Sequence, residues 1–203
     1  MKVSTAQEWL RRWAKRYEKI TGYDPEYNDL IKKHESFTAE DFRRIGKWKD
    51  GVTTEGRWRP NVASVAYIVW EQATKELPKC PDESRVEVFL KGWSNREYED
   101  IFKNGPRKKH FGLSRASILL HFVSGGRYPI FDSRVRAAIA RLLDRPQLAD
   151  TTASYLTKFL PVFNELAESC DCKTTEELRM LDKALFAYGA LDKSIFLELT
   201  ATL

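Results

Sequence analysis

The sequence predicts an all-α fold, and this prediction depends on three observations. In most segments of the 203-residue chain, apolar residues recur at the spacings of three and four that one face of a helix requires. Glycine, proline and helix-capping residues separate these segments. No segment shows convincingly the alternation of apolar and polar residues that favours a half-buried strand.

The composition is that of an ordinary folded protein. Hydrophobic residues make up 42% of the chain and charged residues 31%, which suits one large domain or two small lobes that share a core. The six Trp, eight Tyr and eleven Phe can fill a core or stack on unpaired bases. The formal net charge of +5 favours a polyanionic partner such as nucleic acid, although many basic proteins bind none.

The sequence argues against several classes of protein. No apolar run reaches the roughly 18 residues of a membrane helix, and the charged N-terminus differs from a signal peptide, so we expect a cytoplasmic protein without membrane contact. The cysteines, Cys80, Cys170 and Cys172, are odd in number and lack C-x2-C spacing. We therefore expect no disulfide framework, no metal site, no iron–sulfur cluster and no other cofactor.

The first predicted helix covers residues 5–20, between a cap at Ser4 and a stop at Gly22. Its apolar face consists of Trp9, Leu10, Trp13, Tyr17 and Ile20. Its opposite side carries Arg11, Arg12, Lys15, Arg16 and Lys19. Such a basic side is more often a solvated surface than a binding site. Residues 22–28 are expected to form a loop, with Pro25 as a breaker.

Further helices are expected before residue 106. Thr38 to Asp41 has the pattern of a capping box, and it opens a helix that extends through Trp48. A polar loop over 50–57 precedes a helix from Pro60 to about Glu76. Two more helices are expected over 82–93 and 95–103, the second ending at Asn104-Gly105-Pro106.

The segment 107–143 is the most informative part of the sequence. A basic run leads to the turn Phe111-Gly112-Leu113, and Ser114 begins an apolar helix that ends at Gly125-Gly126. A short extended linker, Tyr128 to Phe131, contains Pro129, and Asp132 then caps a second helix. Two more helices follow, over 152–169 and after a cap at Thr174 or Thr175.

The turn before Ser114 suits phosphate binding. Gly112 lets a backbone approach closely, and the free amides at the following helix start attract an anion. The cationic side chains near it are Lys108, Lys109, His110 and Arg115. A hairpin without a ligand explains the same pattern, so both interpretations stay open.

Asp132 also allows two interpretations. As a structural residue it accepts hydrogen bonds from helix amides. As a functional residue it is a carboxylate at the mouth of a cleft between two helical lobes. There it can stabilise an oxocarbenium-like sugar while a glycosidic bond breaks, or activate a water.

The segment 112–135 resembles the helix-hairpin-helix and Gly-Pro-Asp signature of DNA glycosylases, and it is most similar to the adenine-mismatch glycosylases. Gly112-Leu113-Ser114-Arg115-Ala116 matches the Gly-x-Ser-x-Ala stretch of that family. Pro129-Ile130-Phe131-Asp132 matches the family's Pro-φ-φ-Asp segment, and Arg134-Val135-Arg136 continues the match. Weaker similarities cover Phe42 to about Ala73 and Leu181 to Ala190.

The resemblance implies a fold, an activity and a set of site residues. The expected fold is one unit, 1–203, with two lobes: lobe one about 38–131, a helical barrel with a hairpin at 95–124, and lobe two about 1–37 plus 132–203. Asp132 takes the position of the catalytic aspartate. The expected DNA-binding residues are Lys108, Lys109, His110, Gly112, Ser114, Arg115 and Arg134. Trp48 or Trp58 is expected to wedge or stack against an extruded base.

The sequence also departs from the family. Only Gly112 of the usual Gly-φ-Gly turn is present, so phosphate binding there is expected to be weaker or differently shaped. Ser114 occupies the position of the catalytic lysine of the bifunctional enzymes, which predicts a monofunctional enzyme without lyase activity. The cysteine quartet, the Gln-rich N-terminal helix and the base-protonating glutamate are not found, so the base-pocket residues stay unassigned.

Three hypotheses about function follow. The first is a monofunctional hydrolase of N-glycosyl bonds: a monomeric DNA N-glycosylase that excises a damaged, mismatched or modified base from duplex DNA. The second is a non-catalytic DNA-binding module of a repair, restriction or phage-defence system. The third is a helical interaction protein with no nucleic-acid role. Fold alone does not decide between them.

Overall fold

The computed structural model describes residues 3–21, 25–50, 69–100 and 107–190 of the chain. The prediction of a mostly helical protein is confirmed for these residues, which also contain one two-stranded sheet. The two-lobed glycosylase-like arrangement stays a prediction. In the described part of the chain, no helix has the length and apolar character needed to cross a membrane.

The chain divides into two compact units. The terminal unit consists of Met1–Tyr23 and Pro129–Leu203, and the central unit consists of Asp24–Tyr128. The resemblance predicts lobe boundaries near residues 37 and 131, whereas the units divide after Tyr23 and Tyr128.

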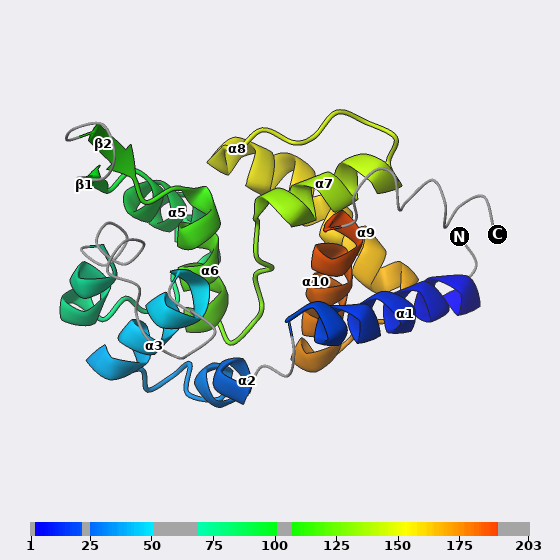
Figure 1. Cartoon of the computed structure of the whole chain (residues 1–203), viewed down its shortest axis with the longest axis horizontal. Helices are drawn as coiled ribbons and strands as arrows, with labels where there is room; N and C mark the ends of the chain where they lie inside the picture. The colour runs from blue at the N-terminus through cyan, green and yellow to red at the C-terminus, as the bar shows by residue number, and fades with distance from the viewer. Residues whose placement is uncertain (1–2, 22–24, 51–68, 101–106, 191–203) are drawn as a thin grey trace. The chain divides into compact units, whose positions relative to one another are not determined.

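The terminal unit is built around α10, Thr175–Gly189. Helix α1, Val3–Thr21, packs against α10, which it crosses in Figure 1, and confirms the helix predicted over 5–20. The rings of Trp9 and Trp13 from α1 contact Tyr188 of α10 edge-on, at centroid distances of 5.7 and 5.0 Å. Helix α7, Ser133–Leu142, also packs against α10.

The approach of α7 to α10 depends on a glycine. A Cβ atom on Gly189 would lie 1.7 Å from the carbonyl oxygen of Arg134, in the first turn of α7. No side chain fits in that space, so the two backbones come closer than any other residue would permit. This contact fixes the start of α7, the helix that Asp132 precedes.

The helix predicted over 152–169 is confirmed, but it is not regular. It consists of α8, Thr152–Ser154, a π-helical turn, Tyr155–Phe159, and α9, Leu160–Ser169. The amide of Leu160 donates to the carbonyl of Tyr155, five residues earlier. Pro161 has no amide hydrogen to donate to Thr157, which favours this wider turn.

The central unit contains the remaining helices. They are α2, Pro25–Ile31, α3, Ala39–Asp50, a helix over 69–76, α5, Val86–Ser94, which follows one 3-10 turn at Glu83–Arg85, and α6, Leu113–Val123. Trp70 is fully buried and contacts Phe111 at a centroid distance of 4.9 Å. The predicted loop over 22–28 is wrong from Pro25 onward, because proline at a first helical position starts α2.

The helix predicted over 95–103 is wrong. Residues Glu97–Asp100 form strand β1, which pairs antiparallel with β2, Arg107–His110. In the pairing register Glu99 is opposite Lys108 and Asp100 is opposite Arg107, so acidic positions of β1 pair with basic positions of β2. The segment 95–103 is too short for its apolar spacing to distinguish a helix from a strand, and the strand that pairs with it, β2, lies outside the segment. The hairpin predicted over 95–124 does not begin with a helix, because β1 and β2 lie between α5 and α6 in the chain.

The predicted caps at Thr38, Asp132 and Thr174 are present, whereas the cap predicted at Ser4 is wrong because α1 already begins at Val3. The Thr38 hydroxyl accepts from the Asp41 amide at 3.4 Å, and the Asp41 carboxylate accepts from the Thr38 amide at 3.0 Å. Thr174 forms a capping box with Glu177 at the start of α10. These contacts join residues three apart, which is why a short sequence pattern predicts them.

Candidate catalytic aspartate and candidate nucleic-acid contacts

Asp132 is the N-cap of α7, as the sequence predicts. Its Oδ1 accepts hydrogen bonds from the amides of Arg134 and Val135, both at 2.9 Å. The residue is 8% exposed, so the carboxylate lies at the edge of the core with one oxygen fixed by the helix start. An N-terminal helix end favours a negative charge at this position.

The linker that leads to Asp132 is held by buried side chains from distant parts of the chain. The Tyr155 hydroxyl donates to the Pro129 carbonyl at 3.0 Å, and the Asp182 carboxylate accepts from the Ile130 amide at 3.3 Å. Phe131 packs on the ring of Tyr155 at a centroid distance of 5.5 Å. The backbone before Asp132 therefore has little freedom to move.

The last residue of the central unit is held as well. His121 of α6 is 1% exposed, and its Nδ1 lies 2.7 Å from the Tyr128 carbonyl oxygen. Because a carbonyl only accepts, Nδ1 donates, and Nε2 lies within hydrogen-bond distance of the Tyr27 hydroxyl oxygen, at 2.9 Å. This buried chain of contacts fixes the first residue of the linker.

Asp182 is an acid near the candidate site whose pKa is shifted well above its ordinary value. Burial raises the pKa of Asp182 to about 6, and the charge of Asp132 acts in the same direction, while the Arg179 guanidinium opposes both. Arg179 donates to the Asp182 carboxylate, and its other terminal nitrogen lies 3.4 Å from the Tyr17 hydroxyl of α1. Asp132 and Asp182 are thus electrostatically coupled carboxylates of one unit.

Local sequence patterns do not mark Tyr155 or Asp182 as site residues. Each is separated from its linker partner by 26 or 52 residues along the chain. Tyr155 and Asp182 lie on helical faces that the spacing assigns to the core or the surface. Only the π-helical turn, next to Pro161, marks the place of Tyr155 as unusual.

The predicted phosphate-binding turn has the backbone that glycine permits. Gly112 has a φ of +82° and is the N-cap of α6, with no side-chain cap for the first amides of that helix. Its own amide donates to the Ser94 carbonyl, and the Phe111 amide donates to the Arg96 carbonyl. These two bonds tie the end of α5 to the start of α6.

The predicted cations Lys108, Lys109 and His110 lie on β2 and are exposed. Lys108 forms an ion pair with Glu97 at 3.2 Å, and the register sets Lys109 opposite Tyr98 and His110 opposite Glu97. The three acidic residues of β1 equal the three Lys and Arg residues of β2 in number. The two strands are therefore balanced in charge, which weakens the electrostatic attraction that the basic strand alone would exert on phosphate.

The other predicted DNA-binding residues are divided between the units. Ser114 and Arg115 lie half-buried in the first turn of α6, where Arg115 donates to the Phe111 carbonyl at 3.1 Å. Arg134 is exposed in the terminal unit, two residues after Asp132, with its guanidinium 4.5 Å from the centre of the Phe186 ring. The structure brings Gly112, Ser114 and Arg115 together, and separately Asp132 and Arg134.

The structure describes one of the two tryptophans that are predicted to contact a base. Trp48 is half-buried and packs against Phe122 at a centroid distance of 5.4 Å and against Tyr27 at 6.0 Å. Trp58 lies outside the described residues. Trp48 thus has a packing role within the central unit, whatever else it contacts.

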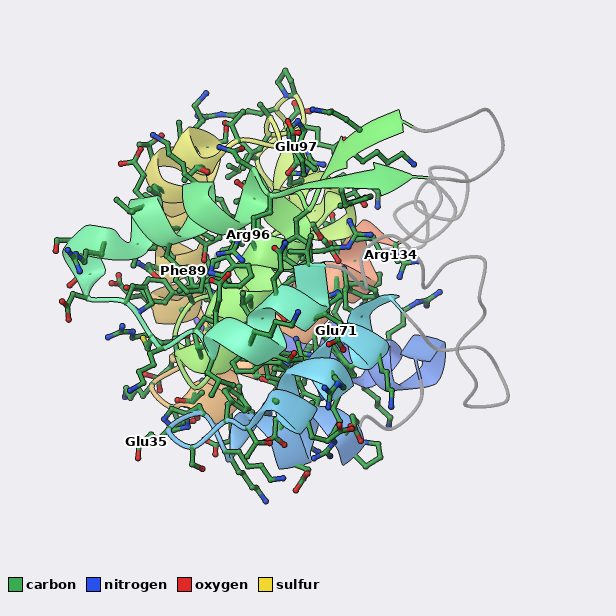
Figure 2. The ribbon with its side chains drawn as sticks, turned by 90° about the vertical axis from the view of Figure 1, so that its left-hand side faces the viewer. Glu35, Glu71, Phe89, Arg96, Glu97 and Arg134 are labelled. Carbon is green, nitrogen blue, oxygen red and sulfur yellow. The ribbon has the colours of Figure 1, made fainter. Side chains whose placement is uncertain are left out.

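A shallow hollow of about 470 Å³ lies beside the end of α5. It is lined by Val88, Lys91, Gly92, Asn95 and Arg96. Arg96 marks the junction of α5 and β1 in Figure 2, and it donates two hydrogen bonds of 2.6 Å to Glu76. The guanidinium is also stacked on Trp93, 3.5 Å from the ring centre, so its role here is structural. We assign no reaction to this hollow.

Over the described ranges, no three His, Cys, Asp or Glu residues are grouped so that they could hold a metal ion. Cys170 and Cys172 are free thiols, and burial raises the pKa of Cys172 to about 11. A thiol with so high a pKa is a poor nucleophile at neutral pH.

No protein-family model, curated protein or solved structure matches this chain.

Proposed function

We propose that this protein is a DNA-binding, monofunctional DNA N-glycosylase that excises a damaged, mismatched or modified base, with Asp132 as its catalytic carboxylate. One observation carries the proposal: a nearly buried carboxylate at the start of α7, whose preceding linker is braced by Tyr155 and Asp182. A catalytic group must hold its geometry, and this one is held on both sides.

The chemistry needs a negative charge next to a sugar that becomes positive. The bond between the sugar carbon and the base nitrogen breaks, and its electron pair leaves with the base. Asp132 stabilises the oxocarbenium-like sugar and accepts a proton from the water that attacks the same carbon. Ser114 stands where the bifunctional enzymes have lysine, so the reaction ends with an intact sugar–phosphate backbone.

In this proposal the turn at Gly112 holds a backbone phosphate. The first amides of α6 point toward the helix start, and Gly112 provides no side chain to cap them. Contacts to phosphate fix the register of a protein on DNA without reading its sequence. The charge-balanced pair of strands next to this turn contributes less to DNA affinity than β2 alone suggests.

The test is a base-release assay on duplex and single-stranded oligonucleotides that carry a panel of damaged and modified bases, cleaved afterwards with hot alkali. Asp132→Asn keeps an oxygen for the Arg134 and Val135 amides but removes the charge, so it should stay folded, bind DNA and release no base. Asp132→Ser keeps a good cap and should also be inactive. Thr174→Ala is the control for loss of a cap, because it removes the side-chain cap of another helix and no carboxylate near the linker.

A non-catalytic DNA-binding module is the second candidate, and one observation favours it. Both hydrogen bonds described for Asp132 are those of an ordinary helix cap. This candidate predicts that wild type releases no base from any substrate of the panel, while Asp132→Ala and Thr174→Ala each lose about 1 kcal/mol of stability. Release by wild type and not by Asp132→Asn rejects it.

A further inference from the structure

Helix α1 has one apolar side and one basic side, and only the apolar side is buried. Ala6, Leu10, Trp13, Ala14 and Tyr17 are each at most 9% exposed and form the side that meets the rest of the terminal unit. Arg11, Arg12 and Lys15 are exposed and Arg16 is half-buried on the other side. We call these four residues the basic face of α1.

The charges of this face are poorly neutralised. Along α1, five Lys and Arg residues outnumber two glutamates. Arg12 pairs with Glu8 at 3.5 Å, but both side chains are more than half exposed, so the pair contributes little. No ion pair is found for Arg11 or Lys15 with any residue that the structure describes.

Other arginines of the protein are engaged in a different way. Arg44 contacts Glu26 and Asp29, Arg96 contacts Glu76, and Arg179 contacts Asp182. The basic strand β2 faces an acidic strand. The helix dipole does not explain the basic face either, because Arg11 and Arg12 lie far from the last turn, where that effect fades.

We propose that the basic face of α1 is a second nucleic-acid contact, which holds the phosphate backbone against the terminal unit. The choice of DNA as the partner rests on the proposed function. The residues involved are ones that the sequence alone predicts to be solvated surface. Successive helical turns place Arg11 with Lys15, and Arg12 with Arg16, about 6 Å apart. One guanidinium group can donate two parallel hydrogen bonds to the oxygens of one phosphate, and this face carries three arginines.

An anionic membrane is a poorer partner for this helix. A helix that lies on a bilayer must insert an apolar side among the lipids. The apolar side of α1 is already buried, with Trp13 against Tyr188 and Tyr17 against Phe186. Tyr17 also contacts Arg179, which binds Asp182, so α1 belongs to the packed unit that carries Asp132.

The test compares the salt dependence of DNA binding by three full-length proteins. The first is wild type, the second is Arg11→Gln/Arg12→Gln/Lys15→Gln, and the third is the control Arg145→Gln/Lys158→Gln/Lys173→Gln. The control removes the same charge from exposed positions of the same unit. Circular dichroism should give similar unfolding midpoints for all three, because exposed substitutions change stability by about 0.5 kcal/mol or less.

The readout is the slope of log Kd against log salt for a fluorescent duplex without damage. Each lost phosphate contact reduces that slope by about 0.9, so the α1 variant should lose roughly 2 to 3 and the control less than about 1. Equal changes in the two variants overturn the proposal. Binding of wild type to phosphatidylserine vesicles that depends on the α1 residues, with an unchanged DNA slope, also overturns it.

The outcome is separable from that of the proposed activity. If Asp132→Asn abolishes base release while the α1 variant keeps the wild-type slope, the activity stands and the α1 contact is rejected. If the slope falls while no substrate of the panel loses a base, the α1 contact stands and the catalytic assignment fails.

Discussion

Replacing Gly189 by alanine tests how α7 and α10 approach one another. The new Cβ would lie 1.7 Å from the Arg134 carbonyl oxygen, 2.6 Å from its carbon and 3.1 Å from the Ala138 nitrogen. Ordinary contact begins at 3.4 Å, so the helices must separate by about 1.7 Å at this point. The atoms in the way belong to backbone, which cannot rotate aside as a side chain can.

The expected loss of stability follows from this displacement. Overpacking costs about 1 to 3 kcal/mol, and disturbing the first turn of α7 weakens the Asp132 cap by about 1 kcal/mol more. We expect Gly189→Ala to reduce the free energy of unfolding by about 2 to 4 kcal/mol, or the midpoint by roughly 5 to 15 °C.

Gly92→Ala is the matched control. Gly92 lies within α5, and a Cβ there meets no atom within 4 Å. Alanine should therefore stabilise the helix by about 0.5 to 1 kcal/mol. Urea and thermal unfolding followed by circular dichroism measure both variants. A Gly189→Ala protein within 0.5 kcal/mol of wild type would refute the close approach of the two backbones.

Three further predictions concern single side chains. Because burial raises the pKa of Asp182 to about 6, above the ordinary 3.8, the folded state binds the extra proton between these values. The stability that the protonated acid contributes is therefore lost as pH rises from about 4 to 6. In urea unfolding, the free energy of unfolding of Asp182→Asn should rise relative to that of wild type over this interval, and a constant difference contradicts this. Tyr155→Phe leaves the buried Pro129 carbonyl without its donor and should cost about 1 to 3 kcal/mol in urea unfolding, whereas an unchanged midpoint means that the bond is dispensable. Lys108→Ala should change stability by less than about 0.5 kcal/mol, since both partners of its pair with Glu97 are exposed, and a larger thermal shift would show a stronger pair.

Local patterns predicted much of the helical structure and its caps. The cap at Asp132 and the capping boxes at Thr38 and Thr174 join residues two or three apart, so their chemistry is visible in a short stretch of sequence. The apolar spacing predicted α1 and the helix over 152–169 because each buries one long face. The β hairpin was missed because β1 has only four residues and is stabilised by the strand that follows it.

The sequence by itself determined the caps of α3, α7 and α10, which residues are apolar enough to be buried, and that Asp132 caps a helix after a proline-containing linker. Only the tertiary structure decided what holds that linker, because Tyr155 and Asp182 come from distant helices. It also decided which basic segment keeps an excess of positive charge. Strand β2 pairs with the acidic β1, whereas α1 buries its aromatic side and leaves Arg11, Arg12 and Lys15 exposed to solvent. Charge patterns are local, but their neutralisation depends on contacts between residues far apart in the chain.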